Sequence, residues 1–132
     1  MNEEFKLEIV NPERSFLSKE DITEVVVPAY EGEMGILKDH ISIISFLKPG
    51  IIKINSKSGD EKFYVEDGIL EFKDNLLSIL TSSIFNLKNL EKNLIEKLLK
   101  DSEKILQDES IDDEKRFLIN QKIDVLKSIS FN

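Results

Sequence analysis

The sequence has no cysteine, no tryptophan and only one histidine, His40, among its 132 residues. Without cysteine the chain has neither disulfides nor thiolate chemistry, and a zinc site would depend almost entirely on carboxylates. No apolar run approaches the roughly 18 residues of a membrane-spanning helix, so we expect no direct membrane insertion. Residues 1–4 are acidic at two positions and no apolar run follows them, which argues against a signal peptide.

Basic residues are also in short supply. The 18 lysines and arginines are outnumbered by 26 aspartates and glutamates, which gives a net charge of −8. Nucleic-acid binding needs a basic face for phosphate contacts, so we expect no nucleic acid as a partner. Binding to anionic lipid is disfavoured for the same reason, and a role at a membrane would run through another protein.

Glycine and proline are missing from residues 69–132. All 5 glycines and all 3 prolines lie within residues 1–68. This change predicts two domains, a β-sandwich docking domain over residues 1–86 and an antiparallel two-helix hairpin over residues 87–132. The predicted fold class is therefore an all-β sandwich, or flattened barrel, followed by a C-terminal α-helical hairpin.

Short β-branched runs between turn signals predict the strands of the first domain. The clearest is Phe5–Ile9, where apolar and polar residues alternate. We expect Pro28 to stop the strand that begins at Ile22, and Asp67–Gly68 to form a tight hairpin. Further strands are predicted over Ile41–Leu47, Ile51–Ile54, Lys62–Glu66, Ile69–Phe72 and Leu76–Leu80.

Leucines three or four residues apart predict the helices of the second domain. The first helix is expected to start at Leu87 and to run for about 20 residues, or roughly 30 Å. Ser110 followed by Asp113 resembles a capping box and predicts the start of the second helix. The apolar stripes predict that the helices pack on each other and on the sandwich through Leu90, Leu94, Leu98, Phe117, Ile123 and Leu126.

Sequence motifs for catalysis, metal binding or nucleotide binding are absent. His40 has no serine or cysteine nucleophile poised beside it, and with Glu31 and Glu33 it makes only a weak ligand cluster. The glycines of Glu31–Gly35 lack the G-x-G-x-x-G spacing of a dinucleotide site. We therefore expect no catalytic residue, no metal and no cofactor, and the residues alone indicate a binding or coupling module.

The most specific series of motifs is the succession E-G-E-x-G-I-L, H and L-K-P-G between Glu31 and Gly50. In its order and spacing this series, within a match that covers residues 5–84, resembles the epsilon subunit of bacterial F-type ATP synthase. The trailing helices agree in position and length but hardly in sequence. The matching segments are Ile9–Glu13, Val25–Pro28, Glu31–Leu37, His40, Leu47–Gly50 and Asp67–Glu71.

The resemblance implies a non-catalytic rotor subunit of the central stalk. Such a subunit binds gamma, sits on the ring of c subunits and couples proton flow to ATP synthesis, peripherally at the cytoplasmic face of the bacterial inner membrane. The resemblance also implies that Glu31, Gly32, Glu33 and His40 form one docking edge for the c ring. The alternatives are that the glycines only permit the turn, that the carboxylates are solvated and that the histidine packs or caps a strand.

The resemblance makes a further suggestion about the hairpin. In many relatives it extends along gamma into the catalytic head of alpha and beta subunits and restrains ATP hydrolysis; here Lys115, Arg116 and Lys122 would make those contacts. Residues 88–93 lack the Asp and the Arg-Ala pair with which some relatives bind ATP, so ATP sensing is not expected. Apart from the resemblance, the residues leave open a stand-alone β-sandwich adaptor or ligand-binding module with a helical arm.

Overall fold

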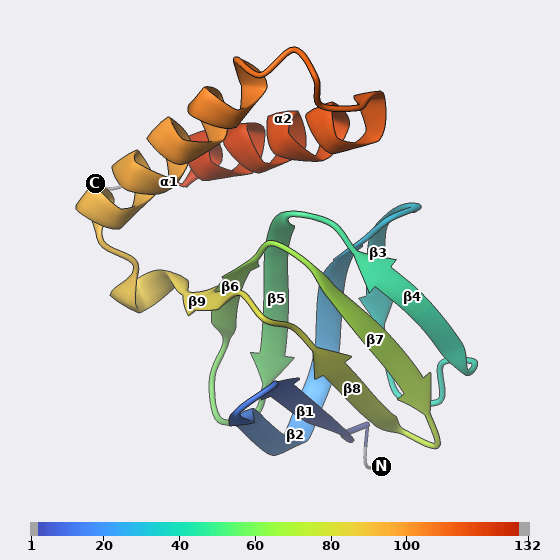
Figure 1. Cartoon of the computed structure of the whole chain (residues 1–132). Coiled ribbons are helices and arrows are strands. Elements are labelled where there is room, and N and C mark those ends of the chain that lie inside the picture. The colour runs from blue at the N-terminus through green and yellow to red at the C-terminus, as the bar shows by residue number, and fades with distance from the viewer. Residues whose placement is uncertain (1–2, 130–132) are drawn as a thin grey trace.

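The computed structural model describes residues 3–129, and it confirms the predicted fold class. Within these residues a nine-stranded sheet folds over on itself and is followed by a helical hairpin (Figure 1). A 3-10 turn, η1 (Leu87–Asn89), leads into helices α1 (Lys92–Leu106) and α2 (Asp113–Ser128). The strands are β1 (Phe5–Asn11), β2 (Arg14–Ala29), β3 (Gly32–Ile36), β4 (Ile43–Leu47), β5 (Gly50–Ser56), β6 (Glu61–Val65), β7 (Gly68–Lys73), β8 (Leu76–Leu80) and β9 (Ile84–Asn86).

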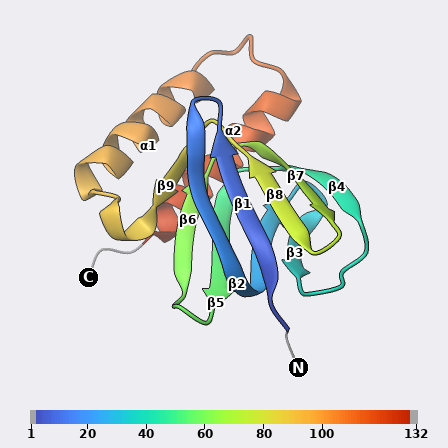
Figure 2. The same cartoon turned by 90° about the horizontal axis from the view of Figure 1, so that it is seen from below.

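The long strand β2 joins the two layers of the sandwich. Its first part pairs with β1, and its last part pairs with β5 and β3, so the strand passes from one layer into the other. The first layer continues from β1 through β8 and β7 to β4, and the second runs from β5 through β6 to β9. Figure 2, a view from below, shows β1 and β8 in front and the hairpin behind the sheets.

The inward-facing residues of both layers form one apolar core. Along β1, Phe5, Leu7 and Ile9 are buried while the residues between them are more exposed, as the two-residue period of a strand requires. Phe5 meets Phe72 of β7 edge-on, with ring centroids 5.6 Å apart. The core continues through Ile22, Val25, Val27, Ile36, Leu47, Ile52, Ile54, Phe63, Val65, Leu70, Leu77 and Ile79.

The tight hairpin turn lies between β7 and β8 and not at Asp67–Gly68. Asp74 and Asn75 take positive φ angles of 50° and 59°, as a two-residue turn of type I′ between antiparallel strands requires. The hairpin predicted at Asp67–Gly68 is wrong, because β6 pairs with β5 and β9 whereas β7 pairs with β4 and β8. Gly68 instead crosses between the layers, where a Cβ atom would lie 2.9 Å from the Leu80 carbonyl oxygen.

β2 continues through Pro28 to Ala29, so the prediction that proline ends the strand is wrong. The Pro28 carbonyl accepts a hydrogen bond from the Lys48 amide at 3.0 Å, beyond the last β2–β5 pair at Val26. In a β-strand the N–H and C=O of one residue point to the same side. The position where Pro28 lacks an N–H therefore faces the β4–β5 turn, and the proline costs no hydrogen bond with β3.

The start of the hairpin differs from the single long helix predicted from Leu87. The Asn86 side chain accepts from the Lys88 amide and caps the short turn η1, and α1 begins only at Lys92, for a length of 15 residues. The predicted Ser110 cap is also wrong. Asp112 caps α2 by accepting from the Lys115 amide at 2.7 Å, while Ser110 donates to Asp108 in the link between the helices.

The hairpin lies against the outer face of β5, β6 and β9 (Figure 1). Leu90, Ile95 and Leu126 are buried there with Tyr64 of β6, and Leu94 and Leu98 pack against them in part. Ile123 is also buried, but Phe117 is 59% exposed, so its predicted packing role is wrong. In the described part of the chain, no helix combines the length and the apolar character needed to cross a membrane.

Candidate docking surfaces

Glu31 of the β2–β3 turn and the first two residues of β3, Gly32 and Glu33, form what we call the acidic turn. The Tyr30 amide donates to the Phe46 carbonyl oxygen at 3.0 Å, which ties the turn to β4. Gly32 has a φ of 136°, a conformation that favours glycine. Close packing supports the base of the turn, since a Cβ atom on Gly50 would lie 2.5 Å from the Pro28 Cβ. The backbone of the acidic turn is therefore held in place by its hydrogen bond to β4 and by close packing at its base.

The two carboxylates of the acidic turn are both exposed but differ in their surroundings. The Glu31 carboxylate accepts a hydrogen bond from the Ser45 hydroxyl of β4 at 3.1 Å. Glu33 lies on β3, an edge strand whose one pairing partner among residues 3–129 is β2. Glu31 thus contacts β4, whereas Glu33 lines a groove together with Lys48 and with Gln121 of α2. Exposed carboxylates of this kind suit a basic or polar partner.

The structure does not bring His40 together with the acidic turn. The acidic turn lies at the start of β3, whereas His40 lies in the loop after that strand, next to the β7–β8 turn (Figure 1). Its ring packs edge-on against Phe72 with centroids 5.8 Å apart, and its Nδ1 lies 2.7 Å from the Ile41 carbonyl oxygen. The single docking edge expected from the sequence is therefore wrong for His40, which packs on the sandwich.

An exposed row of apolar side chains begins directly beside the acidic turn. Its members, which we call the apolar row, are Tyr30, Phe46, Ile69 and Leu80, and between 42% and 59% of each is exposed. The rings of Tyr30 and Phe46 are 6.4 Å apart, and the register pairs Phe46 with Ile69 and Ile69 with Leu80. The row therefore crosses β4, β7 and β8 as one contiguous patch on the outer face of the first layer.

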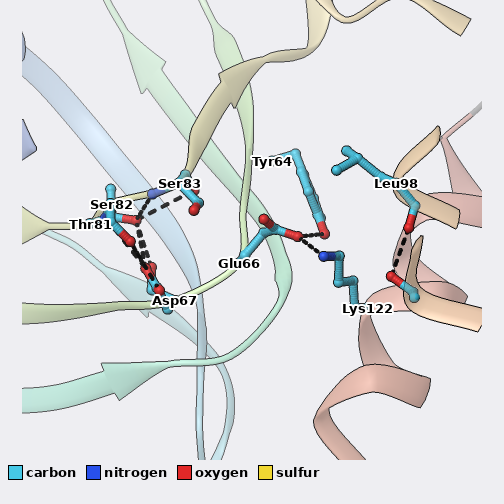
Figure 3. Close-up of polar contacts among 9 residues, drawn as sticks. Tyr64, Glu66, Asp67, Thr81, Ser82, Ser83, Leu98 and Lys122 are labelled. Carbon is cyan, nitrogen blue, oxygen red and sulfur yellow. Dashed lines mark hydrogen bonds and ion pairs between the residues drawn. The ribbon is translucent and has the colours of Figure 1, made fainter. Parts of the chain in front are cut away.

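The outer face of the second layer is covered by the hairpin and carries a polar cluster at its rim. Tyr64 is fully buried beneath the helices, and its hydroxyl donates to the Glu66 carboxylate at 3.2 Å. Lys122 of α2 makes an ion pair with the same carboxylate (Figure 3). Burial, and next the charge of Glu66, raise the pKa of the Tyr64 phenol well above its usual value.

Two of the three basic residues predicted to contact the catalytic head have partners within the chain. Arg116 Nη1 donates to the Leu106 carbonyl oxygen at 3.2 Å and so satisfies the end of α1, and Lys122 pairs with Glu66. Lys115 is exposed. In the docked hairpin, contact with another subunit through Lys122 would require its ion pair to open.

The apolar row was not predicted from the sequence, although a signal for it exists. In β4, Ser45 faces inward while Ile44 and Phe46 face outward, opposite to what their polarity suggests. A strand with apolar residues on both faces indicates burial on both sides, which in an isolated chain leaves one face for a partner. Within residues 3–129, no group of three or more His, Cys, Asp or Glu residues is arranged to hold a metal ion.

Comparisons with known proteins agree with this architecture. A family model described as "ATP synthase, Delta/Epsilon chain, beta-sandwich domain" matches residues 4–86. The chain is 68% identical over 130 residues to an ATP synthase epsilon chain from Pelagibacter ubique, covering 98% of this chain and 100% of that one. It is 34% identical over 101 residues to the ATP synthase epsilon chain of Rhizobium johnstonii, covering 76% and 74% of the two chains.

Solved structures show the same fold. A chain from the cryo-EM structure of Euglena gracilis mitochondrial ATP synthase superimposes with a TM-score of 0.73 at 20% identity, covering 94% of this chain and 78% of that one. A chain from the central stalk and c ring of Tetrahymena thermophila mitochondrial ATP synthase gives 0.69 at 17% identity, covering 95% and 96%. With the family match over the sandwich and the near-complete alignment at 68% identity, the chain belongs to the delta/epsilon chain family of ATP synthases.

Proposed function

We propose that the chain is a non-catalytic rotor subunit of a proton-translocating ATP synthase, linking the gamma subunit to the c ring in the central stalk. Membership of the delta/epsilon chain family supports a place in that complex. The Tetrahymena relative of the same fold was described with the central stalk and c ring, and the Euglena relative with F1 and the c ring. Because the chain belongs to this family, the alternative of a stand-alone adaptor is not favoured.

The apolar row is the proposed contact with gamma. A permanent partner within a stalk favours an apolar, fully desolvated interface, because obligate interfaces resemble a protein core cut in two. Tyr30, Phe46, Ile69 and Leu80 form the contiguous exposed apolar patch that such a partner requires. This patch is the observation that carries the proposal.

The acidic turn is the proposed contact with the c ring. It projects next to the apolar row, so one chain can touch two partners at a shared corner of the sandwich. Glu31 and Glu33 suit polar or basic loops of the ring, where exposed charges set orientation and specificity more than affinity. The chain would then be held at the membrane surface peripherally, through the complex and at its cytoplasmic face.

Co-purification from detergent-solubilised membranes tests the gamma contact. We expect Phe46→Lys to remove the chain from the purified complex, because the charge would be buried against an apolar partner. Ile41→Lys is the matched control, since Ile41 is 77% exposed but lies beside His40, away from the row. Equal retention of both variants would contradict the assignment of the row to gamma.

The hairpin is a candidate brake on ATP hydrolysis, as a second function of the same chain. Its apolar cluster is separate from the sandwich core, so the helices can leave without opening that core. Removal of the chain after Phe85 is expected to raise ATP hydrolysis by the assembled enzyme if Lys115, Arg116 and Lys122 reach the alpha and beta subunits. Unchanged hydrolysis, with the truncated chain still bound, would argue against a brake.

A further inference from the structure

We propose that Ser45 is a positioning residue that fixes the Glu31 carboxylate for docking, an inference that rests on the proposed contact between the acidic turn and the c ring. Ser45 lies in the middle of β4 and is only 5% exposed. Its inward-facing neighbours along the strand, Ile43 and Leu47, are apolar and pack in or against the core. A polar residue at an apolar core position calls for a specific reason.

The hydroxyl of Ser45 has its partner outside the strand. It donates to Glu31 Oε2 at 3.1 Å, across 14 residues of sequence, and makes a longer contact of 3.4 Å with the Phe46 carbonyl oxygen. A buried hydroxyl without a partner is costly, so this bond favours one orientation of the Glu31 side chain. The second oxygen of the Glu31 carboxylate can still accept a hydrogen bond from a partner, because each carboxylate oxygen is an acceptor of its own.

Fixing this carboxylate matters for binding because a glutamate on a surface turn samples several rotamers. Ordering such a side chain when a partner arrives weakens association, and a side chain that is already ordered avoids this loss. Glu33 has no side-chain hydrogen bond or ion pair within the described residues, and it provides an internal comparison. Glu31 is therefore the preorganised charge of the pair, and Glu33 the mobile one.

The position of Ser45 also allows the two proposed interfaces to be altered independently of each other. Ser45 precedes Phe46 of the apolar row, just as Glu31 follows Tyr30, and the backbone bond from Tyr30 to Phe46 holds the two pairs side by side. Ser45 faces the interior while Phe46 faces outward. Loss of the hydroxyl is thus expected to disturb the acidic turn and to leave the row that meets gamma in place.

The test uses the full chain assembled with gamma and measures the affinity of this assembly for the c ring reconstituted in lipid nanodiscs. We expect Ser45→Ala to weaken c-ring binding about 2- to 10-fold, the usual effect of one hydrogen bond, and to leave the affinity for gamma unchanged. Ser45→Thr, which keeps the hydroxyl, is expected to bind like the unaltered chain. On a Glu31→Ala background, Ser45→Ala is expected to have no further effect.

Each result has a defined meaning. If Ser45→Ala weakens c-ring binding as much on the Glu31→Ala background as alone, Ser45 acts by supporting the fold and the inference is overturned. The inference also fails if Glu31→Ala weakens binding while Ser45→Ala does not. If Glu31→Ala and Glu33→Ala both leave c-ring binding intact, the proposed c-ring contact itself fails. Thermal unfolding of each variant identifies any loss that reflects folding.

Discussion

The two outer faces of the sandwich carry similar apolar residues, but one face is buried and the other is exposed. On the second layer, Tyr64 is covered by the chain's own hairpin and is fully buried. On the first layer, Tyr30 and Phe46 remain 45% and 59% exposed. The covered face contributes to the stability of the chain alone, whereas the open face contributes only when a partner binds. A contiguous patch of exposed apolar side chains is typical of a surface that binds a partner, in agreement with the proposed role of the open face.

The same substitution on each face gives the largest expected contrast. Tyr64→Ala removes a buried ring from the contact between hairpin and sandwich, and we expect it to lower the free energy of unfolding by about 3–5 kcal/mol. Tyr30→Ala removes an exposed ring and is expected to change it by less than about 1 kcal/mol. Urea unfolding of the isolated chain measures both values. Similar losses for the two variants would mean that the faces do not differ.

Some features of these faces can be predicted from the sequence and others cannot. The alternation of Phe5, Leu7 and Ile9 specifies a half-buried strand, because one face of β1 is polar. β4 carries apolar residues on both faces and a serine inside, so local polarity assigns its faces the wrong way round. The buried hydroxyl of Ser45 finds its partner in Glu31, a tertiary contact that cannot be read from periodicity.

The separation of His40 from the acidic turn shows a second limit of predicting the site from the sequence. His40 and Glu33 are seven positions apart, and their closeness in sequence suggests one shared edge. Glu33 lies near the start of β3 and His40 in the loop after its end, so the part of the strand from Glu33 to Ile36 carries the two apart at about 3.3 Å per residue. β3 itself was missed because Gly32 and Gly35 indicate a turn, although Gly35 pairs with Val26 within the sheet.

Alkaline pH provides a second way to probe the covered face. The raised pKa of Tyr64 means that the folded chain holds the phenol proton more tightly than the unfolded chain, so this stabilisation is complete below pH 10 and is lost as the pH rises further. In Tyr30→Phe all phenolate absorbance near 295 nm comes from Tyr64, since the chain has only 2 tyrosines. We expect that absorbance to rise only with alkaline unfolding. A separate rise in the folded chain would show that Tyr64 is accessible.

Breaking the ion pair between Lys122 and Glu66 is expected to weaken the contact between the hairpin and the sandwich without removing the hairpin. Lys122→Met leaves Glu66 partly buried without its cation, and we expect a loss of about 1–2 kcal/mol, between the values for exposed and buried pairs. Hydrogen exchange of the α2 amides measures the opening of the hairpin. Lys127→Met is the matched control, because Lys127 is exposed on the same helix. Equal exchange in both variants would mean that the ion pair does not hold the hairpin.

Phe117 is expected to give the smallest effect, although the leucine-like spacing of the sequence predicts that it packs. It is 59% exposed on α2, whereas Ile123 on the same helix is 7% exposed. Phe117→Ser should therefore change the free energy of unfolding by no more than about 0.5 kcal/mol, as surface substitutions usually do, while Ile123→Ala should lower it by about 2–4 kcal/mol. Thermal unfolding of the isolated chain compares the two. A large loss for Phe117→Ser would place this ring against the rest of the chain in solution, and residues 87–129 of the hairpin would then carry no exposed aromatic residue for a partner.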